Sequence, residues 1–265
     1  MHLPISASVV DTLVQLESAG STNDELVLIA PGSAEFTVVV TGDQTAGRGR
    51  LGRVWVAPPG ASLAISVLLR PVLPACEPLE LAHFGWLPLI AGIAMTRAVQ
   101  SLVAPERVGL KWPNDVQVDG LKISGLLAEL LPGGEAVVLG AGLNLSLSRE
   151  QLPTPVSTSL ALVGVGLAGD ELADAALSAY LSSLRELYSG FVRLGGDALG
   201  SGVAEQLDEL CTTIGQRVKV QLPGAPDLVG AAVGIDGSGR LLVRGSLDGQ
   251  VTAVAAGDVT HLRYE

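Results

Sequence analysis

The sequence predicts an α+β fold followed by a small β-barrel. Strand-like runs of β-branched residues at 35–44 and 61–71 precede a long apolar helix pattern at 78–103. In the last fifty residues the pattern changes to short strands separated by tight Gly and Asp turns, which is typical of a small barrel. We therefore expect two domains, residues 1–213 and 214–265.

The N-terminal part predicts two helices before the first strand. Residues 9–16 read as a short helix. Ser21, Thr22 or Asn23 provides a cap for a second helix that begins near Asp24, because short polar side chains accept hydrogen bonds from free N–H groups at a helix start. Both faces of the strand at 61–71 should be buried, because its residues do not alternate between apolar and polar.

The later elements follow from turns and periodicity. The helix at 78–103 carries Pro88 near its start, where a missing N–H is tolerated. Asp119-Gly120 lies between two alternating runs and predicts a hairpin turn. Further strands are expected within "VGLKW", "NDVQV", "LKISGLLAELL" and "AVVLGAGLNLSL", helices at 170–194 and 203–211, and C-terminal strands within "QRVKVQL", "VGAAVGID", "GRLLVRG", "GQVTAVA" and "DVTHLRY".

Charge and composition exclude several function classes. The net charge of -11 argues against general nucleic-acid binding, which requires excess Lys and Arg. Two isolated cysteines give no zinc spacing and fit a reducing compartment. The N-terminus lacks the pattern of a signal peptide, and the apolar segment at 84–95 is too short to span a bilayer. We expect a cytoplasmic protein without a nucleic-acid or membrane partner.

The stretch "TGDQTAGRGRLGRVW" contains Gly47, Gly49 and Gly52 in the spacing G-x-G-x-x-G. A dinucleotide fingerprint requires a helix at these glycines and an acidic residue about 20 positions later, and both are missing. A P-loop requires Lys-Ser/Thr where Arg53-Val54 stands. Two readings stay open: a basic surface turn, or an anion site in which glycines admit a ligand and guanidinium groups hold it.

A second cationic cluster favours the anion site. The chain has only three lysines, and two of them, Lys111 and Lys122, lie in "LKWPNDVQVDGLKISGLLAE". Strand alternation predicts that Lys122 shares a face with Ser124 and Leu126, while Ile123 faces the other way. If that face lines a site, Lys122 is a cation that requires an anion.

Five motifs, in this order and spacing, resemble those of the biotin protein ligases. They are "STN" at 21–23, "DQTAGRGRLGRVW" at 43–55, "KWPNDV" at 111–116, "LKISGLLAE" at 121–129 and "GAGLNL" at 140–145. The resemblance is to the monofunctional type, without an N-terminal DNA-binding domain. It implies a mixed sheet with flanking helices, similar to class II aminoacyl-tRNA synthetase cores, and a C-terminal SH3-like barrel.

The resemblance also implies a two-step reaction. The biotin carboxylate attacks the α-phosphate of ATP to give biotinyl-5′-AMP and diphosphate, and a lysine of a biotin carboxyl carrier domain then takes the biotinyl group. Concentrated positive charge suits this chemistry, since two anions must meet and a loose transition state at phosphorus is stabilised by fixed electrostatics. Mg2+ is the implied cofactor, held mainly by phosphates, and its protein ligands are not assigned.

The resemblance assigns roles residue by residue. The implied biotin-binding residues are Ser21, Thr22, Asn23, Gln44, Gly47, Arg48, Arg50 and Lys122. The implied ATP or adenylate residues are Arg48, Arg50, Arg53, Trp55, Lys111, Asn114, Lys122 and Asn144. The implied catalytic residues are Lys122, Arg50, Lys111 and Asp115.

Simpler interpretations of single residues remain open. The STN motif also reads as an ordinary helix cap, Asp115 as a turn cap, Asn144 as a backbone contact, and Trp55 as a core residue. For the whole chain, a lipoate or octanoate ligase would use the same acyl-adenylate chemistry. A noncatalytic sensor of biotin or an adenylate would bind without consuming ATP.

Overall fold

The computed structural model describes residues 1–222, 226–246, 249–255 and 258–261. A seven-stranded sheet forms the centre, in the order β1-β2-β5-β9-β8-β7-β6, and only β1 and β2 among these neighbours are parallel. The expected mixed sheet is confirmed. Its strands are β1 (Leu13–Leu16), β2 (Val38–Thr41), β5 (Ser62–Leu69), β6 (Val108–Lys111), β7 (Asp115–Val118), β8 (Leu121–Leu130) and β9 (Val137–Asn144).

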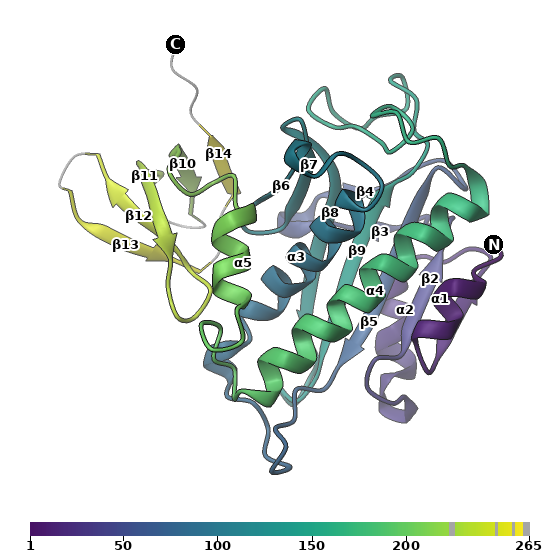
Figure 1. Ribbon diagram of the computed structural model, residues 1–265, viewed down its shortest axis with the longest axis horizontal. Helices are drawn as coiled ribbons and strands as arrows, with labels where there is room; N and C mark the ends of the chain where they lie inside the picture. The colour runs from purple at the N-terminus through teal and green to yellow at the C-terminus, as the bar shows by residue number, and fades with distance from the viewer. Residues whose placement is uncertain (223–225, 247–248, 256–257, 262–265) are drawn as a thin grey trace.

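Helices cover both faces of this sheet. α3 and α4 lie side by side across one face, and α2 packs on the other against β2, β5 and β9 (Figure 1). Residues of β5 are buried along its whole length, as expected for a strand between two layers. The helices are α1 (Pro4–Val9), α2 (Thr22–Ile29), α3 (Trp86–Gln100), α4 (Gly169–Arg193) and α5 (Val203–Leu210).

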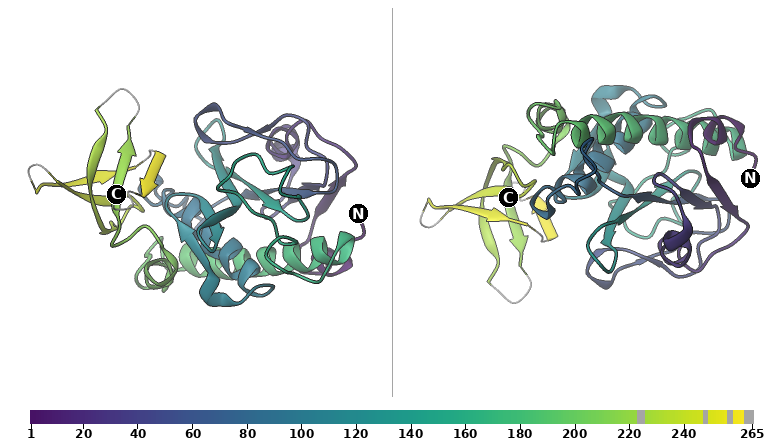
Figure 2. Two further views of the ribbon diagram at one scale, coloured as in Figure 1. Left: turned by 90° about the horizontal axis from the view of Figure 1, so that it is seen from above. Right: turned by 90° about the horizontal axis from the view of Figure 1, so that it is seen from below.

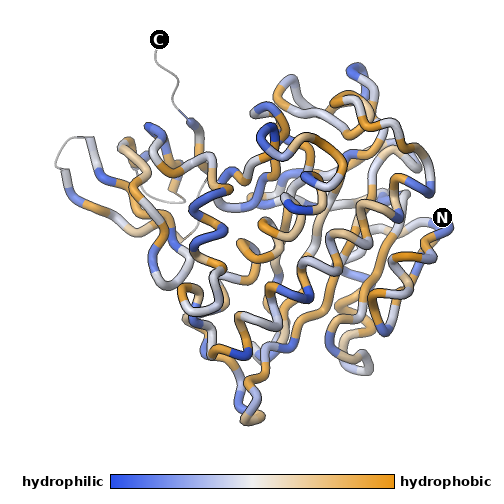
Figure 3. Tube along the Cα trace, viewed as in Figure 1, coloured by the Kyte–Doolittle hydropathy of each residue, from blue (hydrophilic) through white to orange (hydrophobic). Residues whose placement is uncertain are grey.

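The hydropathy of the chain matches this layering. Apolar segments concentrate in the central strands and α3, whereas polar positions recur along α4 (Figure 3). The main core joins the α3 and α4 layer to the sheet, and a smaller core joins α2 to Val39, Leu68 and Val138. Val39 and Leu68 alternate with neighbours that face the main core, so the strands of the sheet centre serve both layers.

Two sequence-based expectations about helices were wrong. Residues 9–16 are not a helix: α1 ends at Val9, and Leu13–Leu16 is the edge strand β1, paired with β2. The apolar spacing there fits a helix as well as a strand, and sheet pairing decides between them. The helix expected from residue 78 begins at Trp86, because Val72 and Pro78 form a bridge and a 3-10 turn at Leu81–His83 precedes it.

The C-terminal strands form the expected small β domain. Among the residues described, five antiparallel strands form its sheet, in the order β13-β12-β11-β10-β14, and lie at one end of the molecule (Figure 2). Of the strand expected within "DVTHLRY", residues 262–264 lie outside the described part. The strands are β10 (Arg217–Gln221), β11 (Leu228–Ile235), β12 (Leu241–Gly245), β13 (Val251–Val254) and β14 (Asp258–His261).

The turn between β11 and β12 packs the C-terminal sheet against the part of the chain that contains the seven-stranded sheet. Trp86 Nε1 donates to the Gly237 carbonyl at 2.9 Å, and Trp112 Nε1 donates to the Gly239 carbonyl at 3.3 Å. Both indoles are almost fully buried, so each pairs its polar atom while packing its ring. These contacts fix the C-terminal sheet against α3 and the end of β6.

Helix α1 is capped from another helix. Its N-cap residue Leu3 has no polar side chain, and the Asp174 carboxylate of α4 accepts the N–H groups of Ile5 and Ser6 at 2.9 and 2.8 Å. The buried Ser6 hydroxyl donates to the same carboxylate at 2.6 Å. Asp174 therefore satisfies donors that a capping residue would otherwise serve.

Replacing Asp174 by alanine is expected to lower the free energy of unfolding by about 3 kcal/mol, because three donors lose a charged acceptor. Burial by itself raises the pKa of Asp174, but the hydrogen bonds from Ser6 and Ile5 outweigh burial and hold the pKa below its ordinary value. This stabilisation is complete above the unfolded pKa and is lost as pH falls through the folded pKa. Urea unfolding at several pH values should show a constant difference from wild type above about pH 5 and a shrinking one below about pH 4.

Asp170→Ala is the matched control. Asp170 lies on the same helix, is exposed, and accepts the His2 N–H at 2.7 Å. Its loss should change the free energy of unfolding by less than about 0.5 kcal/mol. Equal losses in the two variants would contradict the capping role of Asp174.

Candidate active site

The site lies on the face of the sheet that carries α2. β8 and β9 pair so that Gly125 is opposite Gly142 and Leu127 is opposite Gly140. Because alternate residues of a strand share a face, these positions and Glu129 all face the same side as α2. Three of these positions are glycines, so the sheet surface has no side chain at Gly125, Gly140 and Gly142.

The missing side chains make room for functional ones. A Cβ on Gly142 would lie 2.4 Å from the Trp55 ring, and one on Gly140 would lie 2.5 Å from Asn23 Oδ1. A Cβ on Gly125 would lie 3.0 Å from Lys122 Nζ. Each glycine therefore admits a residue of the predicted site close to the sheet surface.

A cavity of about 450 Å3 opens above these glycines, a size that suits a small-molecule ligand. Gly47 lies outside the lining and acts behind Gln44, since a Cβ there would meet Gln44 Nε2 at 2.2 Å. Val259 of the C-terminal sheet also lines the cavity. The predicted site residues that line it are Ser21, Thr22, Asn23, Gln44, Arg48, Arg50, Arg53, Trp55, Lys111, Asn114, Asp115, Lys122 and Asn144.

A buried polar network forms one end of the cavity. The Thr22 backbone N–H donates to Gln44 Oε1 at 2.9 Å, and the Thr22 hydroxyl lies 2.8 Å from the hydroxyl of Ser66 on β5. Ser66 Oγ donates to Asn23 Oδ1 at 2.6 Å. Ser21 is the N-cap of α2, but its side chain makes no capping hydrogen bond. The STN motif is thus more than a helix cap: two of its side chains join this network.

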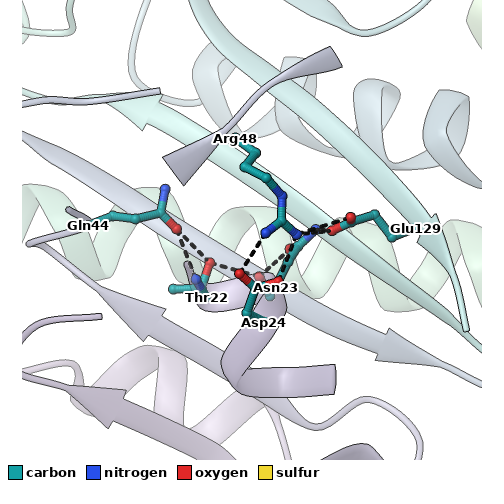
Figure 4. Close-up of polar contacts among 7 residues, drawn as sticks. Thr22, Asn23, Asp24, Gln44, Arg48 and Glu129 are labelled. Carbon is teal, nitrogen blue, oxygen red and sulfur yellow. Dashed lines mark hydrogen bonds and ion pairs between the residues drawn. The ribbon is translucent and has the colours of Figure 1, made fainter. Parts of the chain in front are cut away.

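Arg48 is held by two carboxylates. Its Nη1 lies 2.6 Å from Asp24 Oδ2, and its Nη2 lies 2.7 Å from Asp24 Oδ1 and 3.1 Å from Glu129 Oε1 (Figure 4). The hydrogen bond to Asp24, opposed by partial burial, raises the pKa of Arg48 above its ordinary value. The guanidinium therefore stays charged, at the edge of the cavity and over the first turn of α2.

Arg50 joins the glycine-arginine segment to the sheet. Its Nη1 donates to Asn114 Oδ1 at 3.1 Å, and Asn114 Nδ2 donates to the Leu126 carbonyl at 2.7 Å. The segment itself is the short hairpin of β3 (Gly47–Arg48) and β4 (Val54–Trp55), with Leu51 and Gly52 at positive φ in its turn. The basic turn therefore lies over the cavity and not on an unrelated surface.

Lys122 reaches the cavity by a different route from the one predicted. A β-bulge between β7 and β8 leaves Ile123 unpaired, so Lys122 pairs with Gln117 while Ser124 pairs with Val116. The expectation that Lys122 shares a face with Ser124 and Leu126 was wrong, because the bulge shifts the alternation by one residue. Lys122 instead reaches over Gly125.

The Lys122 ammonium has a carboxylate partner. Its Nζ lies 2.5 Å from Asp115 Oδ1, and both side chains are partly buried, 29% and 23% exposed. The same Nζ lies 5.8 Å from the centroid of the Trp55 ring. In a partly buried site an ion pair holds both of its groups in place. The Asp115 carboxylate therefore fixes the position of the Lys122 ammonium.

Trp55 and Asn144 occupy the glycine-rich part of the cavity. The Trp55 ring lies against Gly142 and Gly125, and its buried Nε1–H has no hydrogen-bond partner among the residues described. Asn144 Nδ2 donates to the Thr158 carbonyl at 2.8 Å, which is the backbone contact that remained open from the sequence. Trp55 is therefore a cavity residue and not part of the main core.

Several site residues were missed at the sequence level. Ser66 lies within a wholly buried strand and gave no sign of a polar role, and Glu129 ends a quoted motif without an assigned function. Gly140 and Gly142 were quoted in "GAGLNL", where spacing by two residues indicates one face of a strand. That signal, with Gly125, was sufficient to predict a bare sheet surface.

Two family models match this chain. The biotin/lipoate A/B protein ligase family matches residues 17–145, and the biotin protein ligase C-terminal domain matches residues 213–262. A biotin--[acetyl-CoA-carboxylase] ligase of Mycobacterium tuberculosis is 39% identical over 248 residues, which cover 92% of this chain and 86% of that protein. The chain belongs to the biotin protein ligases.

Other members of the biotin protein ligases show the same extent of similarity. A biotin--[acetyl-CoA-carboxylase] ligase of Paracoccus denitrificans is 30% identical and covers 91% of this chain and 97% of its own length. The biotin protein ligase of Aquifex aeolicus, solved with biotin and ATP, superposes with a TM-score of 0.70 at 25% identity, over 96% of this chain and 100% of that one. The similarity therefore includes both sheets.

Proposed function

We propose that this chain is an ATP-dependent biotin protein ligase. It forms biotinyl-5′-AMP from biotin and ATP with release of diphosphate, and then transfers biotin to a lysine of a biotin carboxyl carrier domain. The observation that carries the proposal is the meeting, in one cavity, of the Thr22 and Gln44 polar network with the side chains of Arg48, Arg50, Arg53, Lys111 and Lys122.

The polar network provides the biotin end of this site. Ser21, Thr22 and Gln44 are assigned to the ureido head, and Gly47 supports Gln44 through close packing. A ureido group offers two N–H donors and one carbonyl acceptor, so it requires a few fixed polar partners within an otherwise enclosed pocket. The buried Thr22 hydroxyl and the Gln44 amide supply such partners.

The cationic end receives the biotin carboxylate and the phosphates. In the first step a carboxylate oxygen bonds to the α-phosphorus, and the bond from that phosphorus to the bridging oxygen breaks, with its electron pair leaving on diphosphate. Lys122, oriented by Asp115, is assigned to the carboxylate and α-phosphate, and Arg50, Arg53 and Lys111 to the remaining phosphate charge. Charges fixed before the reaction stabilise such a transition state without reorganising.

The adenine is assigned to the glycine-rich surface beside Trp55 and Asn144. Gly125 and Gly142 let the Trp55 ring lie close against the sheet, where it offers a platform for a planar group. Asn114 holds Arg50 and thereby contributes to the same nucleotide end. In the second step the acceptor lysine amine attacks the biotinyl carbonyl carbon, and AMP leaves with the electron pair of the broken bond.

Mg2+ is proposed to enter with the phosphates of ATP. Among the residues described, no group of three or more His, Cys, Asp and Glu side chains is arranged to hold a metal. Asp115 is the carboxylate in the cavity lining, and its Oδ1 already pairs with Lys122. These residues fit a metal bound chiefly by phosphate oxygens, where it would neutralise phosphate charge.

The two-domain organisation and the setting of the protein are part of the proposal. Residues 1–213 are proposed as the catalytic domain and 214–265 as the SH3-like domain, with Val259 reaching the cavity from the latter. The acceptor is a carrier domain of an acyl-CoA or pyruvate carboxylase, and neither a nucleic acid nor a membrane is needed. Among the described helices, none has the length and apolar content to cross a bilayer. We propose a cytoplasmic location.

The test is a mixture of the protein with ATP, Mg2+, biotin and a biotin carboxyl carrier domain, with the products read by mass spectrometry. One biotinyl addition on one carrier lysine, dependent on ATP, is expected. A parallel reaction with lipoate should leave the carrier unmodified. Biotin binding without ATP consumption would indicate a sensor and contradict the proposal, and preferential transfer of lipoate would indicate a lipoate ligase.

A further inference from the structure

Glu129 links two parts of the site without lining the cavity itself. One of its carboxylate oxygens, Oε2, accepts a hydrogen bond from Asn23 Nδ2, and the other, Oε1, accepts one from Arg48 Nη2 at 3.1 Å (Figure 4). Asn23 belongs to the buried network at the head-group end, and Arg48 belongs to the glycine-arginine hairpin. The same carboxylate therefore joins the head-group network to the glycine-arginine hairpin.

The carboxylate determines which way the Asn23 amide points. An ionised carboxylate only accepts hydrogen bonds, so it must face the NH2 group of Asn23 and not the amide oxygen. Asn23 is 5% exposed, and its Oδ1 lies in the space that Gly140 leaves free, since a Cβ there would lie at 2.5 Å. Asn23 Oδ1 is consequently turned toward Ser66.

The orientation of Asn23 determines where the Ser66 hydroxyl donates its proton, and this in turn affects Thr22. Ser66 Oγ lies 2.6 Å from Asn23 Oδ1 and 2.8 Å from Thr22 Oγ1, and a hydroxyl has one proton to donate. The amide oxygen only accepts, so the Ser66 proton is directed to Asn23. Ser66 Oγ therefore has no second proton for Thr22 Oγ1, and the Thr22 hydroxyl donates its own proton to Gln44 Oε1 at 3.3 Å.

The Thr22 hydroxyl is therefore left with lone pairs toward the cavity. Its own proton points to a protein oxygen, Gln44 Oε1, and its neighbour Ser66 Oγ has given its proton to Asn23. A ligand group beside Thr22 must donate a hydrogen bond, because a second acceptor there would leave two buried oxygens facing each other unpaired. A ureido N–H meets this requirement, and a dithiolane ring does not.

We propose that Glu129 is a positioning residue that makes Thr22 Oγ1 an acceptor and so selects a ligand with an N–H at this point. The inference rests on the proposed function, whose ligand carries that N–H. It extends the site to a side chain beyond the cavity wall and gives Glu129 and Ser66 a role in specificity. Arg48 shares the carboxylate, so its contact must be separated from the Asn23 contact by experiment.

Glu129→Gln is the first test, because glutamine has one acceptor oxygen where two donors, from Asn23 and Arg48, require one each. Calorimetric titration without ATP compares biotin with a cyclic carbonate analogue in which oxygen replaces both ureido N–H groups. The wild-type protein should bind biotin with a much lower Kd than the analogue. In Glu129→Gln the biotin Kd should rise about tenfold or more and the analogue Kd by less than about threefold, because tenfold corresponds to about 1.4 kcal/mol, which is within the cost of one mispaired buried hydrogen bond.

Asp24→Asn is the matched control for Arg48. It weakens the other carboxylate contact of Arg48 and leaves Asn23, Ser66 and Glu129 in place. The ratio of the analogue Kd to the biotin Kd should therefore stay within about twofold of the wild-type ratio. An equal fall of the ratio in Asp24→Asn would assign the effect to Arg48 and overturn the inference.

Ser66→Ala is a second test that leaves Glu129 intact. It breaks the connection between Asn23 and Thr22 and should lower the ratio of the analogue Kd to the biotin Kd, as Glu129→Gln does. If thermal unfolding shows that Glu129→Gln is not folded, Ser66→Ala alone tests the inference. An unchanged ratio in folded Ser66→Ala overturns the inference while leaving the proposed function standing. Failure of wild type to bind biotin overturns both.

Discussion

Lys122→Ala is expected to lower the rate of biotin-dependent diphosphate release by about 10³-fold, the loss typical of removing one fixed charge from a developing anion. Lys122 Nζ is partly buried, lies 2.5 Å from Asp115 Oδ1, and extends over the bare strand position Gly125. Its removal also leaves the Asp115 carboxylate facing the incoming phosphates. Single-turnover measurement of diphosphate release separates this chemical effect from product release.

Two further variants distinguish charge loss from structural damage. Lys219→Ala removes the third lysine, which pairs with Asp227 in the C-terminal sheet, and should leave the rate within about twofold of wild type. Asp115→Asn added to Lys122→Ala removes the unpaired carboxylate and should recover part of the loss, up to about tenfold. A Lys122→Ala protein with the wild-type melting temperature and a rate within threefold of wild type would exclude the assigned role.

Much of the site was predictable because its residues lie in continuous motifs. Ser21 to Asn23, Arg48 to Trp55 and Lys111 to Asp115 each carry several cavity-lining side chains at fixed spacing, so a motif brings its residues together. Except for Gly47, the predicted residues line one cavity, and Gly47 supports it through Gln44. The glycines at alternate positions of β9 were predictable in the same way, because they also lie within one continuous motif.

The parts that were not predictable depend on contacts between distant strands. The bulge at Ile123 follows from how β7 pairs with β8, and strand alternation within β8 alone gives the wrong face for Lys122. Ser66 becomes part of the site because α2 packs on β5, which its apolar surroundings do not reveal. Residues 13–16 become a strand because β2 pairs with them.

Glu129 shows why the charge pattern did not predict all the residues around the anion site. The glycine-arginine stretch and the two lysines predicted an anion site, and the structure places two carboxylates, Asp24 and Glu129, around one of its arginines. A guanidinium at the edge of a cavity is held in a defined orientation only when its donors are paired. An anion-binding site therefore needs carboxylates of its own to keep Arg48 in position before a ligand arrives.

Gly142→Ala is expected to raise the KM for ATP about 20-fold, while the biotin Kd stays within about twofold, because a displaced aromatic platform loses 1–3 kcal/mol of stacking on a base. The new Cβ would lie 2.4, 2.6 and 2.7 Å from three atoms of the Trp55 ring, so the indole must move away from β9. Steady-state kinetics gives the KM for ATP, and calorimetric titration without ATP gives the biotin Kd. Trp55 fluorescence should also change on nucleotide binding in wild type and less in the variant, since Trp86 and Trp112 are buried elsewhere.

A double-mutant cycle with Trp55→Ala shows whether the effect passes through the indole. In the Trp55→Ala background the Gly142→Ala change has no ring to displace, so its effect on the KM for ATP should fall below about twofold. Gly190→Ala on α4, where a Cβ meets nothing within 4 Å, controls for the substitution itself and should leave the KM unchanged. If Gly142→Ala raises the KM equally with and without Trp55, the bare strand serves the nucleotide directly, and Trp55 is not its platform.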